Sequence, residues 1–422
     1  MTLDPVHAQG IVRLARQVGR DVDDGEGQAF AETVWERFLD PLVDGSGRVV
    51  VEPLDERFRG RADCEDLALT DRPFETSHGV DSGTINPTTF KNGVVLDAAH
   101  AAVGSVPSDL GVHRARSVVL ALHFDDLSMR YGGDGWRTYD EGFARERIVN
   151  VRGVDRYTEP VVHALALYLA EGYHARRFVD RIDDLLYLDG PLYPKGLLNW
   201  RDLDSDLGAR LEAGLPRDVV ENYVRLVESA LDRGVPLVGF VKNPASRTIT
   251  RTLRERFKRE GETSVETRWS DDAGLFVRLL ERRAEGERLR GELTFTNWFR
   301  SRSGADRAFA SDGDALGIRR AYDPESYEVT FFVIYDPRDD VLYKVEAPYG
   351  LTGEEGTREA LTRQVLSEVA AQRGPPEPIA KADELARIGS EEKRALTRMI
   401  ERETDSEARR SYDDVRWVEG EY

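Results

Sequence analysis

The sequence is poor in cysteine and contains no long apolar run. Its 422 residues include a single cysteine, Cys64, which excludes an internal disulfide and any cysteine-rich metal site. No run of eighteen apolar residues occurs, so we expect no membrane span. The first twenty residues lack a basic segment followed by an apolar core. We therefore expect no signal peptide and a cytoplasmic protein.

Lysine is also scarce, although the chain is highly charged. Seven of the 59 basic residues are lysine and the other 52 are arginine, whereas Asp and Glu number 78, which gives a net charge of −19. An acidic, lysine-poor surface suits a protein that stays solvated in concentrated salt, and we interpret it as a halophile's adaptation. This charge does not exclude a nucleic-acid partner, because counterion release adds little affinity in molar salt.

The hydrophobic pattern between residues 76 and 245 predicts the order β-β-β-α-β-α-β. Thr158 is the expected N-cap of the first helix, and Gly234 is expected to end the second. That order is the one found in the ribonuclease H-like fold. We predict an α/β (α+β) protein in which helices flank a mixed five-stranded sheet. The expected elements are strands at 76–84, 92–106 and 117–124, a helix at 155–182, a strand at 183–194, a helix at 216–234 and a strand at 235–244.

Acidic residues fall where these strands end. Asp81 ends the first strand and Asp189 ends the fourth, inside "YLDGPLYP". Glu159 opens the intervening helix, and Glu171 lies near its other end, about three turns away, so the two cannot share one site. We favour Glu159, because the start of this helix is expected nearer the sheet edge that carries Asp81. Carboxylates gathered there could hold two divalent ions, and hard oxygen ligands suit Mn²⁺ or Mg²⁺.

Six segments resemble, in the same order, those of the NurA family of prokaryotic DNA-end-resection nucleases. The similarity runs from about residue 76 to 400. The chain resembles a haloarchaeal member of this family. The "LDG" strand end, followed about fifty residues later by "GFVK", is the most diagnostic pair. The six segments are "VDSGTINP", "YTEPVVHALAL", "LLYLDGPLYP", "LVGFVKNP", "LYKVEAPYG" and "IAKADELARI".

The resemblance assigns catalytic roles residue by residue. It implies that Asp81, Glu159 and Asp189 are metal ligands, and that Lys242 of "GFVKNP" contacts the scissile phosphate as a point charge. The family usually has a histidine in a late A-H-E-x-A pattern, whereas this chain has Asp383 there. Aspartate is itself a good ligand for a hard metal, so Asp383 is expected as the fourth ligand.

The resemblance also implies an activity, partners and a domain organisation. It implies a 5′ to 3′ exonuclease and single-strand endonuclease that acts on single-stranded DNA and double-stranded ends during double-strand-break resection. A hexameric HerA-type ATPase would supply the motor, since no P-loop pattern occurs in the chain, and a homodimer is expected. The predicted units are a helical N-terminal extension at 1–75, a nuclease domain at 76–400 and a polar, loose tail at 401–422. Within the nuclease domain, the predicted parts are a core at about 76–245, an insertion at about 246–325, and a C-terminal hairpin with helices at 326–400.

Other interpretations remain open. The chain could be a non-catalytic DNA-binding clamp or helicase adaptor that keeps this fold, or a nuclease that prefers RNA. Asp81 and Asp189 could be turn residues. Trp298, Phe299 and Arg300 of "TNWFRSR" could bind a base and a phosphate, although an ordinary core strand is the stronger interpretation.

Overall fold

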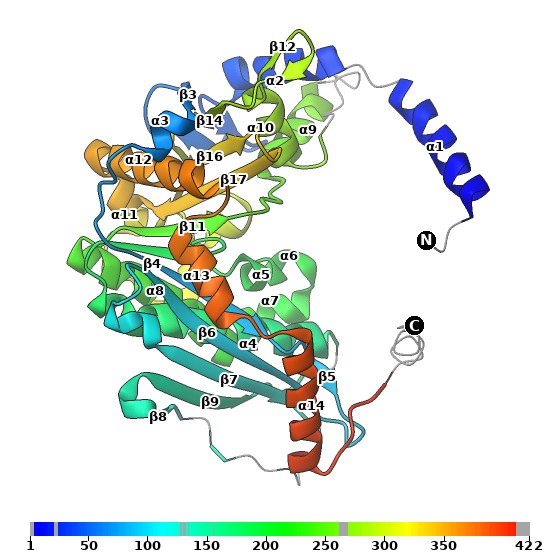
Figure 1. The fold of residues 1–422 in the computed structure, drawn as a ribbon, viewed down its shortest axis with the longest axis vertical. Coiled ribbons are helices and arrows are strands. Elements are labelled where there is room, and N and C mark those ends of the chain that lie inside the picture. The colour runs from blue at the N-terminus through cyan, green and yellow to red at the C-terminus, as the bar shows by residue number, and fades with distance from the viewer. Residues whose placement is uncertain are drawn as a thin grey trace.

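The computed structural model describes residues 4–20, 24–126, 129, 132–133, 135–154, 156–260 and 269–410. Within these residues the strands form one 15-stranded mixed sheet and a separate two-stranded ribbon. Figure 1 shows the arrangement of the helices around the large sheet. The strands are β1 (Leu42–Val43), β2 (Val49–Pro53), β3 (Arg59–Asp63), β4 (Ser77–Thr84), β5 (Thr88–Thr89), β6 (Val95–Val106), β7 (Arg116–His123), β8 (Arg137–Tyr139), β9 (Ala144–Asn150), β10 (Leu185–Asp189), β11 (Leu237–Val241), β12 (Arg283–Ala284), β13 (Glu287–Arg288), β14 (Glu292–Thr296), β15 (Phe299–Ser301), β16 (Val329–Asp336) and β17 (Val341–Pro348). The α-helices are α1 (Pro5–Arg20), α2 (Asp24–Phe38), α3 (Cys64–Ala68), α4 (Thr158–Phe178), α5 (Lys195–Leu198), α6 (Trp200–Leu203), α7 (Ser205–Leu211), α8 (Gly214–Arg233), α9 (Thr248–Glu260), α10 (Asp272–Leu280), α11 (Tyr349–Thr352), α12 (Glu355–Gln372), α13 (Glu377–Ala386) and α14 (Ser390–Thr404).

The centre of the large sheet has the strand order β7-β6-β4-β10-β11. β4, β6 and β7 pair antiparallel, whereas β4, β10 and β11 are parallel. α4 precedes β10, and α8 connects β10 to β11. The predicted order β-β-β-α-β-α-β and the mixed α/β fold class are therefore confirmed. Because the carboxyl ends of parallel strands meet at one edge of a sheet, the ends of β4, β10 and β11 lie together there.

The sheet extends beyond five strands on both sides. β17 pairs antiparallel with β11 and with β16, and the β16–β17 pair is the hairpin expected within residues 326–400. On the other side β9 pairs parallel with β7, and β8 pairs with β9. The polar stretch 125–150, for which the sequence predicted no strand of the core, thus contains two strands, although residues 127, 128, 130, 131 and 134 lie outside the described part of the chain.

The N-terminal segment, expected to be a helical extension, contains strands as well as helices. Residues 4–75 contain α1 and α2, but they also contain β1, β2 and β3. β2 pairs with β15, and β3 pairs with β14, so this segment belongs to the large sheet. These strands are at most five residues long, and β3 is mostly charged, so local hydrophobic periodicity does not reveal them. Pairing with strands more than two hundred residues later creates β2 and β3, and β1 pairs with β2.

Helices cover both faces of the central strands. α4 and α8 pack on one face, and α12 and α13 pack on the other. Along β10, Leu186 and Leu188 belong to the core beneath α4, whereas Leu185 and Tyr187 belong to the core beneath α12 and α13. A strand buried on both faces has a continuous apolar sequence, which is why "LLYL" could be recognised as a strand. Figure 1 shows α13 crossing the sheet above β4 and β6.

The two predicted helix ends had different outcomes. Gly234 ends α8 with φ 64°, a left-handed conformation that glycine adopts without strain, as predicted. Thr158 is not the N-cap of α4, because it is already the first helical residue. The cap position belongs to Tyr157, which has φ 58° and makes no side-chain capping bond.

The C-terminal tail was expected to be loose, but residues 405–410 are attached to the sheet. Lys91 N donates to Glu407 O at 2.9 Å, and Arg409 N donates to Thr89 O at 2.7 Å. These backbone bonds extend the edge formed by β5, which a polar sequence alone does not predict. Residues 411–422 lie outside the described part of the chain. No helix in the described residues is both long enough and apolar enough to cross a membrane.

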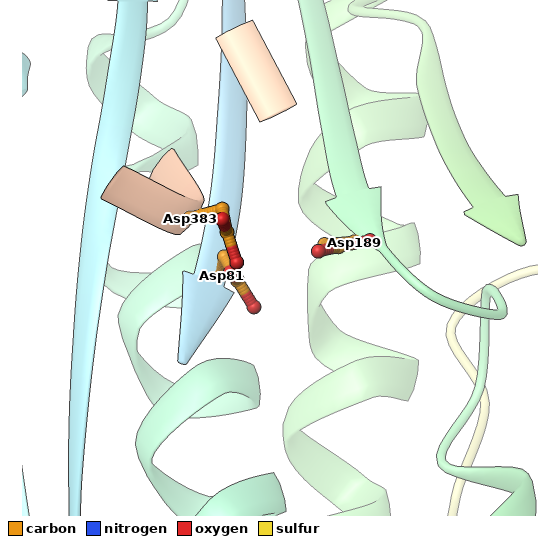
Figure 2. Close-up of side chains that lie close together, drawn as sticks. All are labelled: Asp81, Asp189 and Asp383. Carbon is orange, nitrogen blue, oxygen red and sulfur yellow. The ribbon is translucent and has the colours of Figure 1, made fainter. Parts of the chain in front are cut away.

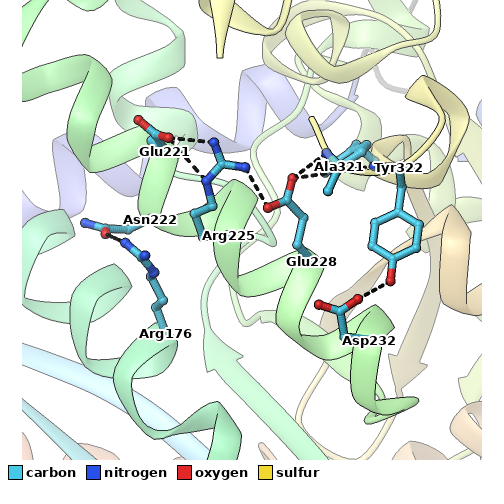
Figure 3. A network of polar contacts seen from close by, with 9 residues as sticks. Arg176, Glu221, Asn222, Arg225, Glu228, Asp232, Ala321 and Tyr322 are labelled. Carbon is cyan, nitrogen blue, oxygen red and sulfur yellow. Dashed lines mark hydrogen bonds and ion pairs between the residues drawn. The ribbon is translucent and has the colours of Figure 1, made fainter. Parts of the chain in front are cut away.

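A polar network ties α8 to the segment that precedes β16 (Figure 3). Glu228, which is 7% exposed, accepts hydrogen bonds from Arg225 Nη1 at 2.6 Å, Ala321 N at 2.8 Å and Tyr327 Oη at 2.7 Å. On the outer side of the same helix, Glu221 also bonds Arg225, at 2.6 Å. The buried carboxylate therefore satisfies donors from three parts of the chain, including a backbone N–H.

We expect Glu228→Ala to lower the free energy of unfolding by about 2–3 kcal/mol, because buried donors lose their acceptor. Glu221→Ala is the matched control, since it removes a carboxylate bound to the same arginine. Its side chain is 36% exposed, so we expect a loss below about 1 kcal/mol. Urea unfolding measures both. Equal losses in the two variants would contradict the role given to Glu228.

Candidate metal centre

Alternation along β4 places Asp81 beneath α13. Val80 packs into the core beneath α4. Neighbouring residues of a strand point to opposite faces, so Gly79, Asp81 and Gly83 share the α13 face. On the neighbouring strand β6, Gly104 pairs with Gly79. Asp81 therefore lies between two glycines, on the face that α13 covers.

These glycines allow α13 to lie directly on the sheet. A Cβ atom added at Gly79 would lie 2.4 Å from Pro378 O, and one at Gly83 would lie 2.4 Å from Ala386 O. A Cβ atom at Gly104 would lie 2.4 Å from Ala382 N. Real Cβ contacts are never so short, so any side chain here would push the helix away. The close approach brings Asp383 of α13 onto Asp81.

Three aspartates meet beside the end of β10. Asp189 ends that strand as expected, whereas Asp81 lies inside β4, three residues before its last residue, because pairing with β6 continues to Thr84. Asp81, Asp189 and Asp383 each offer a carboxylate oxygen, and these oxygens all lie within 4.8 Å of one another (Figure 2). Asp81 and Asp189 are partly buried, and Asp383 is exposed. Three anionic oxygens at this spacing form a suitable donor set for a hard divalent cation. The structure thus brings together three of the four ligands expected from the sequence.

Lys242 follows β11 and points at this cluster. Its Nζ donates to Asp189 Oδ2 at 2.6 Å, and the side chain is 30% exposed. The ammonium offsets part of the negative charge of the three aspartates. A flexible lysine at this position can also reach an anionic group that approaches from solvent.

The structure does not place Glu159 at the cluster. Glu159 Oε1 accepts a hydrogen bond from Thr89 Oγ1 at 2.6 Å, beyond the end of β4. Glu171 lies beside the cluster instead: its Oε2 accepts from Ser82 Oγ at 3.1 Å, and its Oε1 accepts from Tyr223 Oη at 3.2 Å. The preference for Glu159 over Glu171 was therefore geometrically wrong.

The reason is the direction of α4. The helix begins near β5, past the end of β4, and runs back along the sheet. Twelve residues of helix correspond to about 18 Å, which carries Glu171 to the strand residue next to Asp81. Hydrophobic periodicity reveals which face of a helix is buried, but it does not reveal which end lies over the site.

The carboxylates raise one another's pKa values. Burial, followed by the charge of Asp189, raises the pKa of Asp81 to about 7. Burial, followed by the charges of Asp81 and Asp189, raises the pKa of Glu171 to about 8. Burial also raises the pKa of Asp189, although Lys242 opposes the shift. Gathering these groups without a cation is costly, and a bound divalent ion would remove the cost.

A second buried carboxylate holds the chain that follows Asp189. Glu346 on β17 is 1% exposed and accepts hydrogen bonds from Leu192 N at 3.2 Å, Lys195 Nζ at 2.6 Å and Lys344 Nζ at 2.7 Å. Burial alone would raise the pKa of Glu346, but the two ammonium groups lower it to about 2. Leu192 is three residues after Asp189, so Glu346 fixes the turn that orients this aspartate.

Two further sequence interpretations have clear outcomes. Trp298 is 5% exposed and Phe299 is fully buried, so they belong to the core and do not present a base-stacking surface. Arg300 forms an ion pair with Glu328 at 3.2 Å. Sequence reasoning missed the glycines that flank Asp81, although the pattern Gly-x-Asp-x-Gly in a strand was visible and indicates close packing on one face.

Comparison with known proteins identifies the family of this domain. A sequence profile of the NurA domain matches residues 75–388. No curated protein sequence matches the chain. The match does not bear on the haloarchaeal type inferred from composition, for which the comparisons give no support.

Several solved structures show weaker similarity. The NurA nuclease from Sulfolobus solfataricus is 11% identical, with 95% of this chain and 97% of that chain covered and a TM-score of 0.47. A NurA structure with manganese is 11% identical, with 79% and 90% covered and a TM-score of 0.41. A NurA structure bound to dAMP and manganese is 10% identical, with 82% and 91% covered and a TM-score of 0.42.

We expect Gly83→Ala to weaken Mn²⁺ binding about tenfold and to destabilise the protein by about 1–3 kcal/mol, because the new methyl group displaces α13 and with it Asp383. Gly356→Ala is the control, since nothing lies within 4 Å of a Cβ at that helical position. Isothermal titration with Mn²⁺ and urea unfolding measure the two effects. Unchanged Mn²⁺ affinity in Gly83→Ala would show that the contact does not position Asp383.

The raised pKa values predict how stability depends on pH. In the folded, metal-free protein Asp81 and Glu171 stay protonated up to about pH 7 and 8, whereas in the unfolded chain they ionise near pH 4. Folded protein therefore binds more protons in this window, and its free energy of unfolding should fall as pH rises from about 5 to 8.

Urea unfolding in EDTA at pH 5.5, 6.5 and 7.5 measures this fall. Asp81→Asn should make it shallower, because one titrating carboxylate is gone. In the same window the Mn²⁺ affinity of the wild-type protein should rise by up to about tenfold per pH unit for each proton released on binding. Identical pH profiles for the wild type and Asp81→Asn would contradict this description of the cluster.

Proposed function

The chain belongs to the NurA family, and from that membership and the site geometry we propose that it is a divalent-metal-dependent deoxyribonuclease that hydrolyses phosphodiester bonds. The observation that supports this most directly is the cluster of Asp81, Asp189 and Asp383, whose carboxylate oxygens lie within 4.8 Å of one another at the strand ends. A purely structural role would not require three like charges at this spacing, because such charges repel.

We assign the cluster as the metal site. Asp81, Asp189 and Asp383 would bind Mn²⁺ or Mg²⁺, and Glu171 replaces Glu159 as the fourth candidate ligand. Two NurA structures contain manganese, so Mn²⁺ is the first ion to test. A divalent ion at such a site lowers the pKa of water and stabilises negative charge on a phosphate, and two ions can share these tasks.

The protein's own residues contribute positioning and charge. Asp189 is held by Lys242 from the side and by the turn that Glu346 fixes, so its carboxylate has a defined direction. When a phosphodiester enters, the ammonium of Lys242 can shift from Asp189 toward a phosphate oxygen and offset its charge. Ser82 and Tyr223 donate to Glu171 and so favour its ionised form.

The finer features of the function are also proposals. We propose 5′ to 3′ exonuclease and single-strand endonuclease action on DNA, as part of double-strand-break resection. A HerA-type ATPase would act as the separate motor, and the chain would work as a homodimer. The NurA structure bound to dAMP fits a DNA substrate.

We expect the wild-type protein to cut single-stranded DNA when Mn²⁺ is present and not in EDTA. Asp81→Asn and Asp189→Asn should each lower the rate about 100-fold or more, because each removes a charged ligand. Glu171→Gln should also lower it, whereas Glu159→Gln should stay within about twofold of the wild type. Gel analysis of 5′- and 3′-labelled oligonucleotides in high salt measures rate and polarity.

The same assay separates the alternatives. No cleavage with either Mn²⁺ or Mg²⁺, together with tight DNA binding, would favour the non-catalytic clamp and contradict the nuclease. Preferential cleavage of a matched RNA would contradict the choice of DNA. Equal activity of the aspartate variants and the wild type would show that the metal site lies elsewhere.

A further inference from the structure

A polar cavity of about 620 Å³ opens beside the candidate metal centre. We call it the strand-end pocket and define it by Pro191, Val241, Arg247, Arg307 and Lys344, which lie in its wall. These residues come from the end of β11 and the segment after it, from the segments after β10 and β15, and from β17. A volume of this size is typical of sites for small ligands or single nucleotide units.

The pocket and the metal centre adjoin the same strand ends from opposite faces of the sheet, because Val241 alternates with Phe240 of the core beneath α12 and α13, the face that carries Asp81. Val241 lines the pocket, and the next residue, Lys242, bonds Asp189 of the cluster. Likewise Pro191 lines the pocket two residues after Asp189. Consecutive Cα atoms are about 3.8 Å apart, so the wall of the pocket begins within a few ångströms of the backbone that carries the site. Ligands of open α/β sheets bind outside the carboxyl ends of parallel strands.

Most charges in the pocket are already neutralised. Lys195 pairs with Glu346 at 2.6 Å and with Asp306 at 2.9 Å. Lys344 pairs with the same glutamate at 2.7 Å. In the wall formed by α9, Arg251 pairs with Glu255 at 3.0 Å. These ion pairs build a rigid floor, but they leave little net charge for an incoming ligand.

Two arginines in the wall of the pocket differ from these paired charges. Within the described residues, the side chains of Arg247 and Arg307 have no ion-pair or hydrogen-bond partner, and both residues are exposed. The N-terminus of α9 does not add to them, because the N–H groups of Ile249 and Thr250 already bond Asp272. The two guanidinium groups are therefore the part of the pocket that is free to bind an anion.

We propose that the strand-end pocket binds the sugar-phosphate backbone of the DNA strand next to the scissile phosphodiester, with Arg247 and Arg307 contacting its phosphates. This inference rests on the proposed nuclease function and adds a substrate-binding site to it. Guanidinium groups suit phosphate oxygens, because they donate in a planar fork. Among the described residues no aromatic side chain lines the pocket, so binding should depend on the backbone and not on base identity.

The first experiment measures binding without cleavage. A fluorescein-labelled oligothymidylate of twelve nucleotides is titrated with the full chain in EDTA, and anisotropy is followed at several salt concentrations. The double variant Arg247→Gln, Arg307→Gln should raise Kd about tenfold or more. It should also reduce the slope of log K against log salt by about 1.4, since each single-strand phosphate contact contributes about 0.7.

Arg363→Gln is the matched control. Arg363 is an exposed arginine on α12, which covers the opposite face of the sheet. Arg363→Gln should leave both Kd and the slope unchanged, although it makes the net charge of the chain more negative by one. Thermal melts check that all variants fold. An unchanged Kd and salt slope in the double variant would overturn the proposal. So would a change in Arg363→Gln as large as the change that each arginine of the double variant contributes.

The second experiment separates the pocket from the metal centre. Bis(p-nitrophenyl) phosphate is a small phosphodiester that has no neighbouring nucleotides. The double variant should hydrolyse it with Mn²⁺ at the wild-type rate, while its cleavage of the oligonucleotide slows about tenfold. A parallel loss on both substrates would overturn the proposal, because it would place the arginines at the reacting phosphate. If the wild type hydrolyses neither substrate, the proposed nuclease function fails, and the binding experiment in EDTA still decides whether the pocket holds DNA.

Discussion

The close contact between α13 and the central sheet is the constraint on which the rest of the site depends. Ordinary packing of a helix on a sheet keeps the backbones apart by the thickness of their side chains. Here glycines at 79, 83 and 104 remove that layer, and the helix backbone approaches the positions where their Cβ atoms would be. Only this close approach lets the carboxylate of Asp383 lie beside that of Asp81.

The resulting cluster is electrostatically strained without a cation. Burial and mutual repulsion raise the pKa of Asp81 to about 7 and that of Glu171 to about 8, and the only nearby ammonium, among the interactions that the structure describes, belongs to Lys242. The protein supports this arrangement from outside the cluster. Glu346, held by two lysines, fixes the turn after Asp189, and the same lysines form the floor of the strand-end pocket. The metal centre and the substrate-binding surface that we infer thus depend on one set of buried ion pairs.

Much of the centre could be predicted from sequence, because apolar strands that end in an acidic residue are visible locally. "LLYLD" and the alternating segment around Asp81 identified two members of the acidic cluster, and the family resemblance identified Asp383 as the third. The choice between Glu159 and Glu171 failed, since periodicity identifies the buried face of α4 but not its direction across the sheet. The strands β2 and β3 and the attachment of residues 405–410 were missed because distant partners create them.

The central claim is that the three aspartates bind a divalent ion. Anomalous diffraction from a crystal soaked in Mn²⁺ tests it most directly. The account predicts a manganese peak within bonding distance of the carboxylates of Asp81, Asp189 and Asp383, and no such peak in an Asp189→Asn crystal soaked in the same way. A well-ordered wild-type cluster that stays without a peak, or a manganese ion bound only elsewhere on the chain, would contradict it.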